Sequence, residues 1–187
     1  ADGMSTAQAV EAAYEHDGPV YIRINRGFDQ VVYEEPIENF RIGGSNMLRE
    51  GTDLTIIACG AGVWRAVQAA DFLKNEDGLS VRVIDLYSLK PLDEEAIKAA
   101  VGETRRIVTV EDHNIIGGMG SAVADVAATT GKGFTFKKLG IPDCWSIIGQ
   151  PEDLMSYYGF DENGIINTVR ELMKIEVEED DDWDDEV

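Results

Sequence analysis

The chain has 187 residues, of which 44% are hydrophobic, so it is long enough for one sizeable core, or for one core plus a fragment of another. Its formal net charge is −20 at pH 7, and a surface this acidic repels phosphate backbones, which argues against nucleic-acid binding. No window approaches the roughly 20 apolar residues that span a bilayer, and no basic, apolar leader opens the chain, which argues against a membrane protein and against secretion.

The first part of the chain predicts one helix followed by one short strand. Residues 4–16 carry a face of small apolar residues, Ser5 or Thr6 can cap them, and an Asp-Gly-Pro sequence at 17–19 ends the helix. Residues 20–24 then predict the strand. One helix and one strand cannot bury a core alone. Because the chain also does not begin with methionine, we expect this opening to be the last part of a domain whose earlier part is absent.

A second unit begins near residue 41, after a charge-rich connection at residues 28–40 that is predicted to link two domains. From there strand and helix patterns alternate, which implies a mostly parallel sheet with helices on both faces and right-handed crossovers. The acidic run at 176–187 predicts a solvated, disordered tail. We expect strands at 45–48, 54–59, 81–86, 106–110 and 134–139, and helices at 63–73, 93–101, 118–129, 152–157 and 162–175.

The stretch 106–126 is the leading candidate for a functional site. It combines a buried strand, a polar loop at residues 111–114, and three glycines that precede a helix of small apolar residues. In doubly wound α/β domains, ligands and partner surfaces meet the loops at the carboxyl ends of the strands. We therefore expect residues 111–120 to lie at such an edge.

Within this stretch, His113 is the candidate acid or base, because it titrates near neutrality and the neighbouring carboxylates Glu111 and Asp112 could orient it. The alternative is a surface loop whose polar groups only form hydrogen bonds. The glycines of the Gly117–Gly120 loop can form an anion-binding nest at the helix N-terminus. The alternative, that they let the helix pack closely on the strand, is favoured.

Arg23 and Arg26 flank the end of the predicted strand at 20–24. A guanidinium suits a phosphate or a carboxylate through bidentate hydrogen bonds. From the residues alone, an ordinary surface arginine is the favoured interpretation.

A second glycine motif, Gly60-Ala61-Gly62, follows a predicted strand and opens a helix, with Asp85 at the end of the next strand. This imitates a dinucleotide-binding fingerprint. However, Arg65 stands at the third glycine position, where its bulk opposes close helix–strand packing, so a plain tight turn is expected.

The two cysteines, Cys59 and Cys144, form no disulfide framework or zinc motif. Cys144 has no base near it in the sequence, which argues against nucleophilic catalysis. A reducing, cytoplasmic location is the simplest expectation.

The order of these motifs resembles the C-terminal section of transketolases, and most of all that of a split transketolase. Residues 17–27, which read Asp-Gly-Pro-Val-Tyr-Ile-Arg-Ile-Asn-Arg-Gly, resemble the end of the pyrimidine-binding domain. The resemblance covers roughly residues 8–175. Residues 48–60, 83–86, 90–93, 109–113 and 117–123 resemble the transketolase C-terminal domain.

The resemblance implies a three-layer α/β/α sandwich with a mostly parallel, five-stranded mixed sheet. From the resemblance we also expect a remnant of the pyrimidine-binding domain at residues 1–27 and a linker at residues 28–40. The transketolase C-terminal domain then spans 41–175, before the acidic tail at 176–187.

The family enzyme transfers a two-carbon ketol unit between sugar phosphates in the pentose phosphate pathway, using thiamine diphosphate and Mg²⁺. The Gly-Asp-Gly…Asn metal signature of the family and its cofactor-activating glutamate have no counterpart here. We therefore expect the cofactor and metal to be held by parts of the enzyme outside this chain, and this fragment alone to be inactive. The implied partner is an N-terminal section carrying the diphosphate site, in a homodimer or heterotetramer.

The resemblance also implies substrate-binding residues. Arg26 matches the family arginine that binds the sugar phosphate, Arg23 is matched less well, and His113 lies in a family loop near the domain interface. No catalytic residue is expected in this chain. The alternative function is a non-catalytic dimerisation or docking domain of a related enzyme, such as deoxyxylulose-phosphate synthase or an oxo-acid dehydrogenase β subunit.

Overall fold

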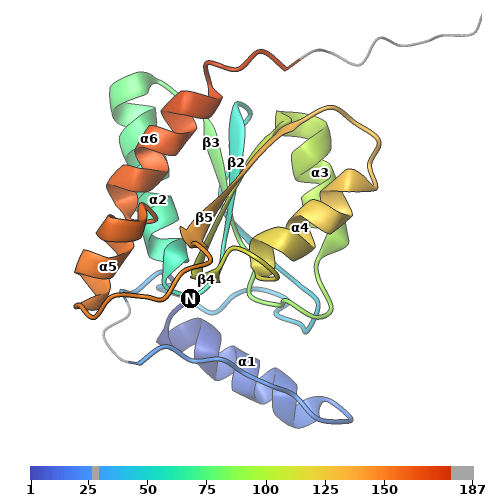
Figure 1. Cartoon of the computed structure of the whole chain (residues 1–187). Coiled ribbons are helices and arrows are strands. Elements are labelled where there is room, and N and C mark those ends of the chain that lie inside the picture. The colour runs from blue at the N-terminus through green and yellow to red at the C-terminus, as the bar shows by residue number, and fades with distance from the viewer. Residues whose placement is uncertain (27–29, 178–187) are drawn as a thin grey trace, which may run out of the picture.

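A five-stranded sheet between two layers of helices forms the centre of the computed structural model, which describes residues 1–26 and 30–177 (Figure 1). The strand order is β1-β3-β2-β4-β5. β1 (Asn46–Arg49) is an edge strand antiparallel to β3 (Val81–Asp85), while β2 (Leu54–Ala58), β4 (Arg106–Asn114) and β5 (Thr135–Ile141) continue the sheet in parallel. The predicted mostly parallel, mixed sheet is confirmed.

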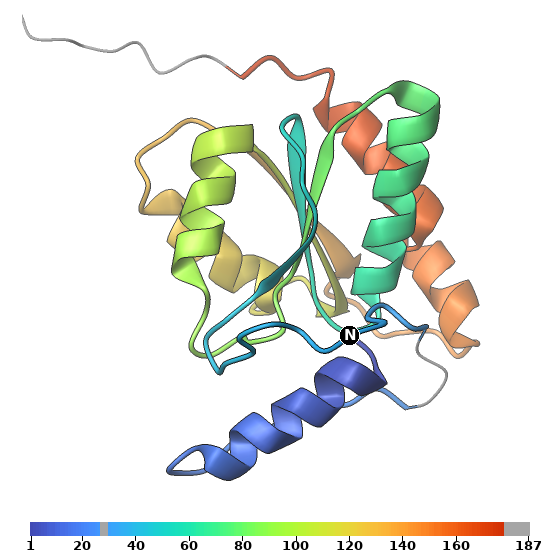
Figure 2. The ribbon, with the colours of Figure 1, turned by 180° about the vertical axis from the view of Figure 1, so that it is seen from behind.

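The helices form one layer on each face of the sheet (Figures 1 and 2). α2 (Gly62–Asp77) and α6 (Glu162–Leu172) pack together on one face, and α5 (Pro151–Tyr158) lies just before α6 on the same side. α3 (Glu94–Thr104) and α4 (Met119–Ala128) cover the other face. The three-layer sandwich is therefore confirmed.

α1 (Gly3–Glu15) belongs to neither layer and lies beneath one end of the sheet (Figures 1 and 2). That end holds the carboxyl ends of the four parallel strands, and we call it the carboxyl edge. The chain turns after α1 and runs back alongside it before it passes under the sheet. The predicted helix at 4–16 is confirmed to within one residue at each end.

The central strands are mostly apolar because both of their faces are covered. Every residue of β2 and of β3 is buried. Successive side chains of β2 alternate between the two layers, since Ile56 joins the core beneath α2 and α6 whereas Ile57 joins the core beneath α3 and α4. Phe160, between α5 and α6, is the largest of the fully buried side chains.

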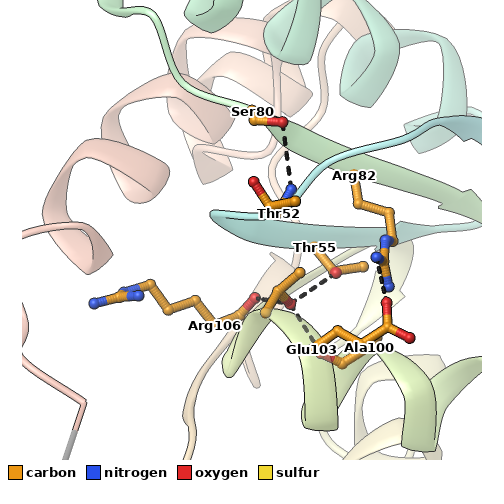
Figure 3. Close-up of polar contacts among 8 residues, drawn as sticks. Thr52, Thr55, Ser80, Arg82, Ala100, Glu103 and Arg106 are labelled. Carbon is orange, nitrogen blue, oxygen red and sulfur yellow. Dashed lines mark hydrogen bonds and ion pairs between the residues drawn. The ribbon is translucent and has the colours of Figure 1, made fainter.

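A small polar cluster fixes the last turn of α3 at the end of the sheet opposite to the carboxyl edge (Figure 3). The Thr104 hydroxyl lies 2.9 Å from the Thr55 hydroxyl and donates to the Ala100 carbonyl at 2.9 Å. Nearby, Arg82 donates to Glu103 at 2.5 Å. These contacts satisfy polar groups where α3 ends and β4 begins.

Two predicted elements near the carboxyl edge are wrong. Residues 20–24 form no strand, because no strand among the described residues lies beside them to pair with; Tyr21 is instead 87% exposed. The predicted polar loop at 111–114 is the last part of β4, since β5 extends far enough for Ile141 to pair with Asn114. The pairing of β4 with β5 changes register between Val110 and Asn114, so the last, polar part of β4 is irregular.

The predicted linker has no helix or strand in residues 30–40, yet it is packed, with Tyr33 and Ile37 buried. Residues 27–29 of this linker and residues 178–187 of the acidic tail lie outside the described residues. The proposed domain boundaries remain predictions.

Candidate functional site

A shallow hollow of about 220 Å³ lies at the carboxyl edge, where β4 ends and α4 begins. Its wall brings together residues that are far apart in the sequence. The candidate residues Arg23 and His113 both line it, and His113 does so from the last part of β4, at the edge where residues 111–120 were expected. Cys59, Leu89, Glu111 and Gly118 also contribute to the wall.

Arg23 is held above the end of β4 by weak polar contacts. One guanidinium nitrogen donates to the Asp112 carbonyl at 3.2 Å and lies 3.8 Å from the Asp112 carboxylate. The other terminal nitrogen donates to Asn25 at 3.4 Å. Because the Arg23 side chain is 52% exposed, this ion pair adds little stability. The guanidinium is thus placed at the hollow while remaining accessible to an anion.

Arg26, the other predicted phosphate contact, is exposed and lies at a bend next to residues that the structure does not describe. It is not among the described residues that line the hollow. Its role in binding substrate stays a prediction.

His113 is exposed, and its Nδ1 lies 3.1 Å from the Asn114 carbonyl. Within residues 1–26 and 30–177, no carboxylate is hydrogen-bonded to its ring. Asp112 is instead directed to Arg23 and Glu111 to α4. The acid–base arrangement suggested by the Glu-Asp-His sequence is therefore absent from the described structure.

Glu111 is the residue whose role sequence reasoning missed. Its side chain is only 1% exposed, and its two carboxylate oxygens accept hydrogen bonds from the backbone of Met119 at 2.6 Å and of Gly120 at 2.8 Å. It thus satisfies two free N–H groups at the N-terminus of α4, where the helix dipole favours a negative charge. The N-terminus of α4 therefore does bind a negative charge, but this charge is the chain's own carboxylate.

The glycines before and inside α4 allow this close approach. A Cβ at Gly118 would collide with the Glu111 carboxylate, and a Cβ at Gly120 would lie 2.5 Å from the Thr109 hydroxyl. Gly117 has φ +74°, a conformation that L side chains rarely adopt, and open space around it. Close packing of helix on strand, the favoured interpretation, is confirmed for Gly118 and Gly120.

The glycine motif at 60–62 forms a tight turn, as expected. A Cβ at Gly62 would lie 3.0 Å from the Val110 carbonyl oxygen, so the turn packs directly on β4. Arg65 is ion-paired with Glu152, and Asp85 is fully buried and accepts a hydrogen bond from Tyr33 at 2.7 Å. Since Asp85 is occupied inside the protein, it is not available to a ribose.

Cys59 is not suited to nucleophilic catalysis. Burial, together with the nearby carboxylates of Glu111 and Asp85, raises the pKa of the Cys59 thiol to about 12, so it stays protonated at neutral pH. Cys144 is a free, exposed thiol.

Residues 43–165 match the family model for the transketolase C-terminal domain. The chain belongs to the transketolase C-terminal domain family. It is 40% identical to a putative transketolase C-terminal section of Methanocaldococcus jannaschii over 94% of this chain and 54% of the relative. It is 37% identical to a 1-deoxy-D-xylulose-5-phosphate synthase of Heliobacterium modesticaldum over 87% of this chain and 25% of that enzyme.

A solved split-gene transketolase, described as an inactive β4 tetramer, superposes with a TM-score of 0.86 at 35% identity. That comparison covers 93% of this chain and 56% of the solved one. The chain therefore spans about half the length of the split-transketolase relatives that it matches.

The part of this transketolase C-terminal domain chain that the structure describes does not fit the thiamine diphosphate and divalent metal that the resemblance implies. Residues 1–26 and 30–177 contain no group of three or more His, Cys, Asp or Glu side chains that could hold a metal ion. The N-terminus of α4, which otherwise suits a phosphate, is filled by Glu111. In the same described ranges, no helix has the length and apolar character needed to cross a membrane.

Proposed function

We propose that this chain is the C-terminal part of a transketolase-type enzyme that transfers a two-carbon ketol unit between sugar phosphates. In this proposal, polypeptide outside the sequence holds the thiamine diphosphate and Mg²⁺, and this chain contributes an assembly surface and a substrate-phosphate contact. The main observation that supports this proposal is the hydrogen bond between Arg23 and Asp112, which are 89 positions apart. It joins the segment that resembles the end of a pyrimidine-binding domain to the C-terminal domain at one edge.

The exposed apolar residues support an assembly role for the carboxyl edge. Tyr21 and Ile24 precede the linker, Ile116 follows β4, and Trp145 and Ile148 follow β5, and all five side chains are exposed. Apolar groups concentrated on one side of a protein mark an interaction surface. We assign this surface to the N-terminal section of the enzyme, in a homodimer or heterotetramer that works in the cytoplasm.

The experiment that tests the function is complementation with the section that carries the cofactor site. Mixing the two polypeptides is expected to give ketol transfer that neither gives alone. In the active mixture, Arg26→Ala is expected to raise the KM for a phosphorylated sugar about tenfold with kcat largely retained, because a charge-assisted hydrogen bond to phosphate is lost.

Arg170→Ala is the matched control, since Arg170 is an exposed arginine on α6 that pairs with Asp77. It should leave the KM unchanged. A KM that is also unchanged in Arg26→Ala would remove Arg26 from the phosphate site, and a mixture without ketol transfer would contradict the proposed function.

A second candidate function is a non-catalytic dimerisation or docking module, and the loop at residues 144–150 favours it. This loop carries no charged residue in a chain whose net charge is −20, so it can meet another acidic surface without repulsion. Trp145 and Ile148 are fully exposed on it. Tyr158 fixes the loop to α5, since its hydroxyl accepts from the Ile147 backbone and donates to Ser146, both at 3.2 Å.

If the chain is such a module, light scattering should show stable self-association that sugar phosphates do not alter. Trp145→Ser should then weaken self-association about tenfold, the effect of removing one buried aromatic anchor from an interface. Met47→Ser, at a half-exposed position on β1, serves as the control. A monomeric wild-type chain would contradict this second function. Ketol transfer on mixing with the N-terminal section would show that the chain is not merely a non-catalytic module.

A further inference from the structure

The loop between β5 and α5 (Figure 1) presents exposed apolar side chains, and the rest of the chain fixes its shape. Trp145 and Ile148 are fully exposed on this loop, and Ile147 is half exposed between them in the sequence. Tyr157 of α5 adds a ring that is 67% exposed. We call these four side chains the apolar patch. A loop that is already held in its bound conformation loses less entropy on binding, so the contacts that hold it affect affinity.

Tyr158 holds the middle of this loop against α5. Its hydroxyl accepts a hydrogen bond from the Ile147 backbone N–H and donates one to the Ser146 hydroxyl, both at 3.2 Å. Its ring packs against the core beneath α2 and α6. The Tyr157 ring lies edge-on to the Tyr158 ring, with the two centroids 5.0 Å apart. Tyr158 therefore joins the part of the apolar patch on the loop to the part on α5.

Arg65 in turn fastens α5 to α2. It lies in the first turn of α2, at the position where a dinucleotide-binding motif has its third glycine. Its guanidinium donates to the Ala61 carbonyl at 2.9 Å and to the carboxylate of Glu152, in the first turn of α5. The Arg65 side chain is only 11% exposed. Removing Glu152 would therefore leave a largely buried charge without its ion-pair partner.

We propose that Arg65 and Tyr158 are positioning residues, which hold the apolar patch in the conformation that binds the N-terminal section of the enzyme. The inference rests on the proposed function for the identity of this partner. Because the loop follows β5, a parallel strand next to β4, it lies at the carboxyl edge, where Arg23 contacts the end of β4. Residues 144–150 carry no charge in a chain of net charge −20, so the surface that they fit is apolar.

Hydrogen exchange in the chain alone tests whether these two residues hold the loop. Arg65→Met and Tyr158→Phe should each make exchange over residues 146–158 about tenfold faster, while β2 and β3 keep their protection. Arg170→Met and Tyr14→Phe are the matched controls, since Arg170 pairs with Asp77 on the surface and Tyr14 is exposed on α1. Both controls should leave exchange over residues 146–158 unchanged.

Two further variants separate the contact between Arg65 and Glu152 from other effects of the Arg65 substitution. Glu152→Gln should act in the same direction as Arg65→Met, and the double variant should exchange no faster than the Arg65→Met single variant, because both changes break one contact. Arg65→Lys keeps a cation that can pair with Glu152, so its exchange should be closer to that of the wild type.

Sedimentation velocity, with the N-terminal section titrated into each variant, measures binding to the proposed partner. Arg65→Met and Tyr158→Phe should raise the concentration for half-saturation about fivefold, because the loop must then be ordered on binding. Ile148→Ser removes a fully exposed side chain of the apolar patch and none of the positioning contacts. It should raise the half-saturating concentration about tenfold while exchange over residues 146–158 stays slow.

Unchanged exchange in both Arg65→Met and Tyr158→Phe would overturn the positioning role, and so would uniformly faster exchange that includes β2 and β3, since that is general destabilisation. Unweakened binding by Ile148→Ser would overturn the docking surface. A wild-type chain that binds only itself would assign the apolar patch to a second copy instead of the N-terminal section. Binding of the wild type without ketol transfer would contradict the proposed function and still support this inference.

Discussion

Replacing Glu111 with alanine is expected to lower the free energy of unfolding by about 3 kcal/mol, which corresponds to a fall in Tm of roughly 10 °C for a domain of this size. The change leaves two buried N–H groups, those of Met119 and Gly120, without their acceptor. It also removes the negative charge that lies at the N-terminus of α4. Since Glu111 forms part of the wall of the hollow, the loss of stability should be greatest there.

Urea titration at neutral pH measures this effect, and Asp112→Ala is the control because Asp112 is the neighbouring, partly exposed acid. The control should change the free energy of unfolding by less than about 1 kcal/mol, as expected for an exposed ion pair. Glu111→Gln should fall between the two, since its single amide oxygen can accept only one of the two hydrogen bonds at its usual geometry. Equal stability of Glu111→Ala and Asp112→Ala would show that α4 does not depend on this carboxylate.

Much of the fold follows from local sequence patterns. The strands β2 and β3 are rich in β-branched apolar residues and buried throughout, because both of their faces are covered. The intervening helices have one apolar side, and Asp93 caps α3 by accepting from the Ala96 backbone N–H at 3.2 Å. Such elements are determined by residues close in sequence, so their predicted bounds agree with the structure to within a few residues.

The errors occur where an element depends on a distant partner. A strand at 20–24 requires a neighbour to pair with, and the sequence of the segment cannot reveal that the described chain provides none beside it. The extension of β4 to Asn114 depends on Ile141 of β5. The cap of α1 is Asp2 because the same carboxylate also binds Val32 and Tyr33, a tertiary constraint invisible in the helix sequence.

The position of the candidate residues in the fold was easier to predict than their contacts. The rule that ligands meet the carboxyl ends of parallel strands led to His113, which lines the hollow, whereas the resemblance of residues 17–27 pointed first to Arg26, which does not line it, and less well to Arg23, which does. The direction of the Glu111 side chain could not be predicted, because a strand residue near a register shift can face either side. An acid eight positions before a glycine-rich helix start is the only signal for its role as an internal cap.

Alanine substitutions at two helical glycines are expected to have opposite effects on stability. A glycine inside a helix normally costs about 0.5–1 kcal/mol relative to alanine. Gly102 in α3 should follow this rule, because a Cβ there would meet only the tip of the flexible Lys132 side chain at 3.3 Å. Gly102→Ala should therefore raise the free energy of unfolding by about 0.5 kcal/mol.

Gly120→Ala should instead lower the free energy of unfolding by about 2 kcal/mol, the cost of overpacking a tight contact. Its Cβ would lie 2.5 Å from the hydroxyl of Thr109, a fully buried, β-branched residue of β4 that cannot turn away easily. Shifting α4 to relieve the contact would also weaken the hydrogen bond from Gly120 to Glu111. Parallel urea titrations of the two variants measure the expected gain and the expected loss in the free energy of unfolding. If Gly120→Ala were stabilising like Gly102→Ala, the close packing of α4 on β4 would not be what requires glycine at this position.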